Sequence, residues 1–252
     1  TAGNVTVKAT FTYHGKAYAV SAFPAVTNVV PSTTLTSINC GGSRAYSAAD
    51  VKSLAETALV ASGLGITSLT TAIRSVSVGV GSTSSVYAYT NPTTGAVTLS
   101  ANSAYLGQPT LTATVTRTDG STYTMSFAVP VIPIYNQTFE AQYPQAVASV
   151  GNSYNYTVTP PTGYDRIALI TKGTTPTTAQ LTTTPAYNST SITLNSSDFN
   201  TTTGKCTLYV MAWNSNWTSS SNSGKYYYGP LEVYQKNYNI NYNGVAGETV
   251  QF

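Results

Sequence analysis

Apolar and polar residues alternate without a break over residues 5–13, near the start of the sequence. Val5, Val7, Ala9 and Phe11 lie on one side of this pattern, and threonines and a lysine lie on the other. Side chains two apart along a strand point to the same face, so the pattern predicts a β-strand with one apolar face. Such a strand can pair within its own fold, or it can complete the sheet of a neighbouring molecule by strand addition.

The residues that follow indicate a hairpin. His14 and Gly15 form a two-residue connection, and apolar residues resume at Ala17, Tyr18 and Val20. Two alternating runs joined by such a connection are typical of a β-hairpin. This favours pairing within the molecule and leaves the end of any donated strand undefined.

Short runs of the same kind continue through most of the chain. The clearest predicted hairpin joins residues 111–118 to residues 121–129 across Asp119-Gly120. Residues 129–134 contain two prolines and are predicted to be an extended edge or interdomain segment. Residues 22–38 are expected to hold short strands broken by turns. Further strands are predicted at residues 74–80, 86–89, 96–99, 154–158, 165–171, 191–194, 206–213 and 226–234.

One stretch has helical spacing instead. Ser47 is a suitable N-cap, Asp50 lies in the first turn, and Gly63 can end the helix. A lone amphipathic helix among strands usually covers a sheet, so we interpret it as structural. The residues predicted to form its buried stripe are Val51, Leu54, Ala55, Ala58 and Leu59.

The pattern therefore predicts a mainly β protein with an Ig-like β-sandwich architecture. At 252 residues the chain exceeds the usual size of one domain, so we expect two β units and one short amphipathic helix. The expected division is residues 1–13 as a separate strand, 14–135 as a β domain that contains the helix, and 136–252 as an Ig-like sandwich.

Charged residues are scarce, and this changes the expected surface. They make up 8% of the chain, against about 25% in ordinary soluble proteins. Threonine, serine, asparagine and tyrosine must therefore solvate the surface. The net charge of +3 is spread thinly and forms no basic patch, so we expect no nucleic-acid partner. No run of about twenty apolar residues occurs, so no membrane span is expected.

The low number of carboxylates also bears on stability in acid. Acid unfolds many proteins by protonating carboxylates that are paired in the native state. A chain with 8 acidic residues has little of this stability to lose. The composition fits exposure to acid, and it fits equally well a glycan-covered surface at neutral pH.

The most frequent short motif is Asn-x-Ser/Thr, the acceptor motif for N-linked glycans. Several copies fall in predicted loops and strand ends, where a glycan can be carried. With the low charge, they predict an exported glycoprotein whose sugars solvate its surface. The seven acceptors are Asn4, Asn136, Asn155, Asn188, Asn195, Asn200 and Asn216.

Catalytic chemistry has little support in the sequence. His14 is the sole histidine, the acids are dispersed, and no motif organises a nucleophilic serine. We therefore expect no enzyme activity, no metal and no cofactor beyond covalently attached N-linked glycans. The aromatic residues 226–228 and the region of Trp213 and Trp217 are suited to a sugar-binding platform or, equally, to strand packing.

The two cysteines, Cys40 and Cys206, leave two states open. They are too far apart in sequence for a CxxC redox motif, and with a single histidine they make a poor zinc site. An extracellular setting favours a disulfide between them, and the alternative is two buried thiols.

These features together resemble the subunits of archaeal thread-type surface filaments. The resemblance rests on the alternating strand at residues 5–13, the seven acceptor motifs and the β-rich chain. It implies a pilin-like architecture similar to that of bacterial type 1 pilins. It also implies an extracellular, glycosylated homopolymer linked head to tail by donor-strand complementation. Carried over, the donor strand would present Val5, Val7, Ala9 and Phe11 to the next subunit, and residues 238–252 are the second candidate donor.

Two other functions remain open from the sequence. One is a monomeric secreted carbohydrate-binding or adhesin module, and the other is a surface-layer component. Each would act at the cell surface, through adhesion or a surface or glycan receptor.

Overall fold

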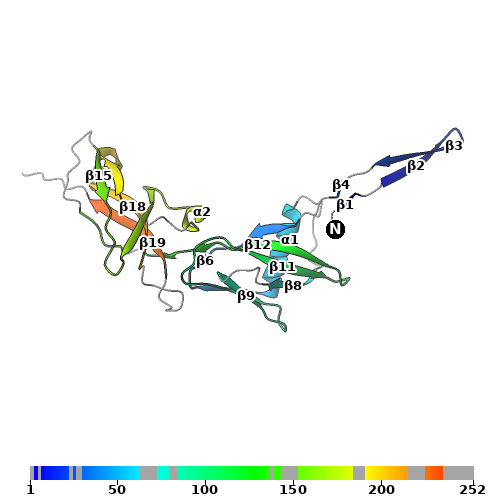
Figure 1. The fold of residues 1–252 in the computed structure, drawn as a ribbon, viewed down its shortest axis with the longest axis horizontal. Coiled ribbons are helices and arrows are strands. Elements are labelled where there is room, and N and C mark those ends of the chain that lie inside the picture. The colour runs from blue at the N-terminus through cyan, green and yellow to red at the C-terminus, as the bar shows by residue number, and fades with distance from the viewer. Residues whose placement is uncertain are drawn as a thin grey trace, which may run out of the picture.

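The structure is a computed structural model that describes residues 3–4, 7–22, 25–26, 30–62, 73–79, 85–136, 139–143, 153–183, 191–214 and 225–234. Figure 1 shows three parts along the longest axis of the molecule. A two-stranded ribbon projects at one end, a first β unit with a helix follows, and a second β unit lies at the other end.

The projecting ribbon is built from β1 (Gly3–Asn4), β2 (Val7–Tyr13), β3 (Lys16–Ala22) and β4 (Ala25–Val26). We call it the arm. β2 pairs with β3 and β1 pairs with β4, both antiparallel. Neither pair is joined to another sheet among the described residues.

The first unit contains two sheets. One has the strand order β5-β12-β11-β8 and the other the order β7-β10-β9, and a short pair, β13 with β6, lies beside them. The predicted hairpin across Asp119-Gly120 is confirmed as β11 and β12. The strands of this unit are β5 (Ser32–Thr34), β6 (Ile38–Asn39), β7 (Ser43–Tyr46), β8 (Ile73–Gly79), β9 (Val86–Thr90), β10 (Val97–Ala101), β11 (Thr110–Arg117), β12 (Thr122–Ala128) and β13 (Val131–Ile132).

Helix α1 (Ala48–Ala61) packs against β5, β7 and β8 of this unit. Its start is the predicted one. The Asp50 N–H donates to Ser47 Oγ at 3.1 Å, and the Ser47 N–H donates to Asp50 Oδ2 at 3.0 Å, which forms a capping box. Four of the five residues predicted to form its stripe are buried, and Leu54 is partly buried against the same core. Gly63 lies outside the described residues.

The second unit is a four-stranded sheet in the order β14-β19-β18-β16, with the pair β15 and β17 packed as a second layer. Its core includes Ile167, Leu194, Leu208 and Leu231. The elements are β14 (Ile134–Tyr135), β15 (Ser153–Thr157), β16 (Arg166–Lys172), α2 (Thr178–Leu181), β17 (Ser191–Asn195), the 3₁₀ turn η2 (Ser196–Asp198), β18 (Lys205–Trp213) and β19 (Tyr227–Tyr234).

The two units meet in a shared hydrophobic cluster. Ala168, Met211 and Trp213 of the second unit are buried in the cluster that contains the core of the first. The rings of Trp213 and Tyr226 lie 5.6 Å apart, and the Tyr226 N–H donates to Cys40 Sγ at 3.3 Å. The units are therefore joined by packing as well as by the chain.

The chain passes between the units as an extended segment, as predicted for residues 129–134. β13 pairs with β6 in the first unit, and β14 pairs with β19 in the second. Asn136 approaches β19 closely at Gly229, where an added Cβ would lie 1.7 Å from the Asn136 carbonyl oxygen. Glycine is required there because no side chain fits.

The mainly β sandwich architecture with two units is confirmed. The helix and the long strands lie within one to two residues of their predicted bounds. Residues 238–252 lie outside the described residues. The alternation along the strands also explains the low charge, because the outer positions of β11 are threonines, such as Thr112 and Thr114, while Leu111 and Ala113 are buried. No helix in the described part of the chain is long and apolar enough to cross a membrane.

We predict that Gly229→Ala destabilises the protein by about 1–3 kcal/mol, because the methyl group forces the backbone of Asn136 away from β19. Gly79→Ala is the matched control, since its Cβ would meet only Thr112 O, at 3.9 Å. Urea unfolding of both variants measures the difference. Equal stability of the two variants would contradict the close approach.

Candidate assembly arm and glycan acceptors

The arm contains two antiparallel pairs that share one register. Val7 pairs with Ala22 and Tyr13 pairs with Lys16, and the Gly3–Val26 pair near the base keeps the same register. The arm therefore extends from the body as a narrow two-stranded ribbon (Figure 1).

The turn at the tip is the one that the sequence predicts. His14 and Gly15 connect the strands with φ values of 47° and 73°. Positive φ at both central residues is typical of a type I′ turn, whose twist matches that of the two flanking strands. His14 lies against Tyr13, with ring centroids 4.3 Å apart, so the sole histidine belongs to the turn.

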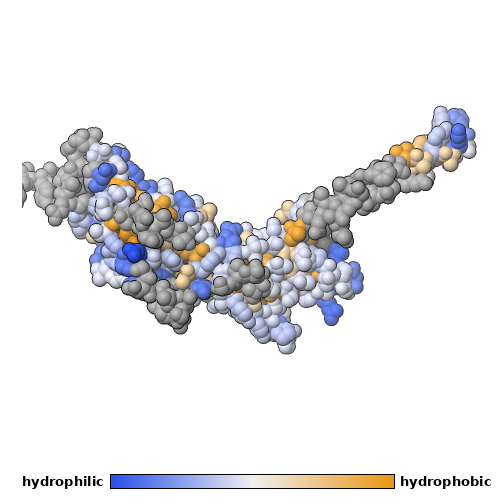
Figure 2. All heavy atoms as spheres, viewed as in Figure 1, coloured by the Kyte–Doolittle hydropathy of each residue, from blue (hydrophilic) through white to orange (hydrophobic). Residues whose placement is uncertain are grey.

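One face of the arm is apolar and exposed. Phe11 pairs with Tyr18, and their rings stack with centroids 5.4 Å apart. Ala9 pairs with Val20 on the same face. Phe11 is 53% exposed and Val20 is 60% exposed. Figure 2 shows hydrophobic residues on the surface of the arm next to its hydrophilic tip.

Residues 9–20 of the arm are all exposed, so no part of the body that the structure describes covers this face. An isolated two-stranded ribbon is marginally stable in water and needs a third strand or a packing surface. Its apolar face is thus an unsatisfied feature of the single chain.

Ala9 and Phe11, two of the four predicted donor residues, lie on this face. Val7 belongs to β2, although its side chain is not among those described, and Val5 lies outside the described residues. Sequence reasoning missed Tyr18 and Val20 as members of the same face. The two-residue turn held the necessary signal, since it sets Tyr18 opposite Phe11.

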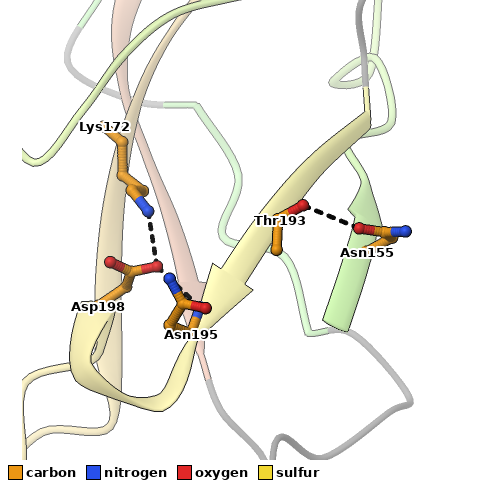
Figure 3. Close-up of polar contacts among 5 residues, drawn as sticks. All are labelled: Asn155, Lys172, Thr193, Asn195 and Asp198. Atoms are coloured by element: carbon orange, nitrogen blue, oxygen red, sulfur yellow. Dashed lines mark hydrogen bonds and ion pairs between the residues drawn. The ribbon is translucent and has the colours of Figure 1, made fainter. Parts of the chain in front are cut away.

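Two predicted glycan acceptors lie on the outer layer of the second unit. Asn155 of β15 and Asn195 at the end of β17 are both exposed. Their environment is polar (Figure 3). The Thr193 hydroxyl donates to Asn155 Oδ1 at 2.9 Å, and the Asn195 N–H donates to Asp198 Oδ2 at 2.8 Å. Lys172 pairs with the same carboxylate of Asp198 at 2.7 Å.

A third acceptor, Asn200, lies in a turn that the chain uses twice. Asn200 Oδ1 accepts the N–H groups of Thr202 and Thr203, and Gly204 follows with φ of 63°. Residues 91–95 form the same turn, since Asn91 Oδ1 accepts the N–H groups of two threonines and the glycine that follows has φ of 70°. Asn91 is not an acceptor, because Pro92 follows it.

The other four acceptors are less fully described. Asn136 directly follows β14 and is half-buried, and Asn4 lies in β1 without a described side chain. Asn188 and Asn216 lie outside the described residues.

Of the two states left open for the cysteines, the structure has two free thiols. Cys40 and Cys206 are both buried, but Cys40 belongs to the cluster of the first unit and Cys206 to that of the second. Burial raises the pKa of Cys206 to about 11 and also raises the pKa of Cys40. The sequence separation alone could not decide between the two states.

Three of the described carboxylates stabilise local structure. Asp50 caps α1, Asp119 accepts from the N–H and hydroxyl of Ser121 in the β11–β12 turn, and Glu232 pairs with Lys205 at 3.2 Å. Among the described residues, no group of three His, Cys, Asp or Glu side chains could hold a metal ion.

The three tyrosines at 226–228 go to three environments. Tyr226 packs against Trp213 at the junction, Tyr227 packs against the core of the second unit, and Tyr228 lies on the opposite face of β19. Strand packing thus accounts for Tyr226 and Tyr227. Trp217 lies outside the described residues.

No family model matches the chain, and no curated protein is similar to it. Solved structures give low scores. The endo-fucoidan hydrolase MfFcnA4 of glycoside hydrolase family 107 is 11% identical over 93% of this chain and 34% of its own, with a TM-score of 0.24. The SGBP-B protein of the Bacteroides ovatus mixed-linkage glucan utilization locus, solved with a heptasaccharide, is 13% identical over 92% of this chain and 53% of its own, with a TM-score of 0.22.

Mouse clustered PcdhgC3 is 10% identical over 92% of this chain and 76% of its own, with a TM-score of 0.22. The chain spans about a third of the first of these three proteins and about half of the second. At these scores the likeness identifies no family.

The paired turns give a test of glycosylation. We expect Thr201→Pro to remove the glycan at Asn200, and Pro92→Ala to create one at Asn91, with no other change in either turn. Proline should fit at position 201, since Pro92 occupies the equivalent position in the turn at residues 91–95. Mass spectrometry of protein expressed in the native host measures occupancy. An unmodified Asn200 in the parent chain would contradict the acceptor assignment.

Acid should weaken the contact that anchors η2. Partial burial acts to raise the pKa of Asp198, but the hydrogen bond from Asn195 and the Lys172 ion pair lower it overall. A lowered folded-state pKa contributes stability above the unfolded value of about 4, and this contribution is lost as the pH falls through the folded value. Asp198→Asn should therefore lower the melting temperature at pH 7 and have little effect at pH 2. The same difference in melting temperature between Asp198→Asn and the parent chain at both pH values would contradict this.

Proposed function

We propose that the chain is a structural subunit of an extracellular, glycosylated filament, linked head to tail by its arm. The observation that carries the proposal is the apolar face of the arm, which is exposed and is not covered by the described residues of its own body. A second copy of the chain is the partner that would complete it. The arm is then the part that one copy gives to the next, as a hairpin rather than as the single donor strand that the resemblance to thread-type filaments implies.

The placement of the arm supports an open assembly. The arm and the second unit lie at opposite ends of the longest axis (Figure 1). A contact between unlike surfaces of identical subunits repeats without limit unless the rotation happens to close a ring. An arm at one end that binds a surface toward the other end would therefore build a filament.

The surface supports an extracellular setting. Asn155, Asn195 and Asn200 are exposed and lie in or beside the outer layer of the second unit. None of the three belongs to the arm, so glycans there would leave the arm free to bind. Adhesion or contact between cell surfaces is the role we assign to such a filament.

We predict that the double variant Phe11→Ala, Tyr18→Ala fails to polymerise. Each large apolar side chain contributes about 1.5–3 kcal/mol when buried, so losing two should weaken association by about two orders of magnitude or more. Negative-stain microscopy and sedimentation measure the assembly. Melting temperature should not change, because neither core cluster includes an arm residue.

The matched control is Thr10→Ala, Thr12→Ala, which alters the opposite face of the same strand. It should polymerise normally. Native material that consists of discrete monomers would refute the filament and favour the adhesin or carbohydrate-binding module. Two-dimensional lattices would favour the surface-layer component.

A further inference from the structure

The outer side of β19 in the second unit is lined with tyrosines, some exposed and some half-buried. Leu231 and Val233 of β19 point into the core, so Tyr228, Glu232 and Tyr234 lie on the opposite side of the sheet. Tyr209 of β18 pairs with Pro230 on that side. We call this surface the tyrosine face; its aromatic members are Tyr135, Tyr143, Tyr209, Tyr228 and Tyr234.

The rings form two groups along β19. Tyr135 and Tyr228 lie 5.2 Å apart, and Tyr143 stacks on Tyr234 at 5.3 Å. Burial raises the pKa of Tyr228, and the nearby phenols of Tyr135 and Tyr209 raise it further, so these hydroxyls share one patch. Tyr135 is 47% exposed and Tyr143 is 60% exposed. Exposed clusters of this kind on a folded protein mark interaction surfaces, where tyrosine is enriched.

The tyrosine face carries little uncompensated charge. Glu232 pairs with Lys205 at 3.2 Å and accepts the hydroxyl hydrogen of Thr207. On the arm, Lys16 is the only permanently charged residue within residues 9–20. Bringing the two surfaces together would thus desolvate few charges, which is the main cost of burying polar interfaces.

The dimensions also agree. β2 and β3 have 7 residues each and β19 has 8, which corresponds to about 23 Å and about 26 Å of extended chain. A two-stranded ribbon is wide enough to cover part of a sheet, and β-sheets stack face to face about 10 Å apart.

We infer that the tyrosine face of one subunit is the surface that receives the apolar face of the arm of the next subunit. The inference rests on the proposed function and specifies its contact. Stacking covers the rings of Phe11 and Tyr18, which addition of the arm to a sheet edge would leave in water. The arm then adds a layer over the half-buried outer side of β19.

Photo-cross-linking in assembled full-length protein tests this contact. A benzophenone amino acid at position 11, in place of Phe11, should cross-link to peptides that contain Tyr135, Tyr143 or residues 227–234 of another copy. The same probe in place of Thr12, on the opposite face of β2, should not reach these peptides.

The outcomes separate this inference from the proposed function. Cross-links from position 11 to an edge strand such as β8 or β16, in intact filaments, would overturn the face-to-face contact and leave the arm as the link. A chain that stays monomeric with no cross-link between copies would refute the filament itself.

A variant provides the second measurement. Tyr135→Ala, Tyr143→Ala should raise the protein concentration needed for filaments by about tenfold or more, the cost of truncating aromatic residues central to an interface. Tyr87→Ala is the control, because Tyr87 is 62% exposed on β9 of the first unit. If the double variant polymerises normally but loses retention on immobilised mannan, the tyrosine face is a carbohydrate platform and the inference is wrong.

Discussion

The junction between the two units determines how the rest of the molecule is arranged. The side chains of Met211 and Trp213, on β18 of the second unit, are buried in the hydrophobic cluster of the first unit. The Tyr226 N–H donates to Cys40 Sγ at the same junction. Alternation along β18 makes this possible, since one set of side chains fills the core of the second unit while the other set faces the junction. The same side of this sheet is therefore buried near the first unit and only half-buried at its far end.

The sequence predicts the local elements of this fold well. The capping box at Ser47, the type I′ connection at His14 and the Asp119-Gly120 hairpin are formed by neighbouring residues, so the pattern of a few positions was sufficient. The short strands β6, β13 and β14 were not resolved individually. Each has two residues and exists because a distant strand pairs with it in parallel, and nothing local records that partner.

The candidate sites also divide into local features, which the sequence predicts, and features that depend on distant residues, which it does not. Acceptor motifs are local, and the exposed positions of Asn155, Asn195 and Asn200 agree with them. Which cluster buries a given residue depends on the layer that its strand face packs against. This holds for Tyr226 to Tyr228 and for the two cysteines. That is a property of packing between residues far apart in the chain, and spacing in the sequence does not contain it.

The separate burial of Cys40 and Cys206 has a consequence for how the protein tolerates its surroundings. The thiolate is the form that reacts with oxidants and disulfides, and a thiol with a pKa of about 11, as at Cys206, holds almost none of it at neutral pH. Neither core is held together by a bond between the two cysteines, so a reducing medium has no such bond to break. Folding of the two units therefore needs no disulfide between these cysteines, and their burial keeps both thiols away from other copies of the chain.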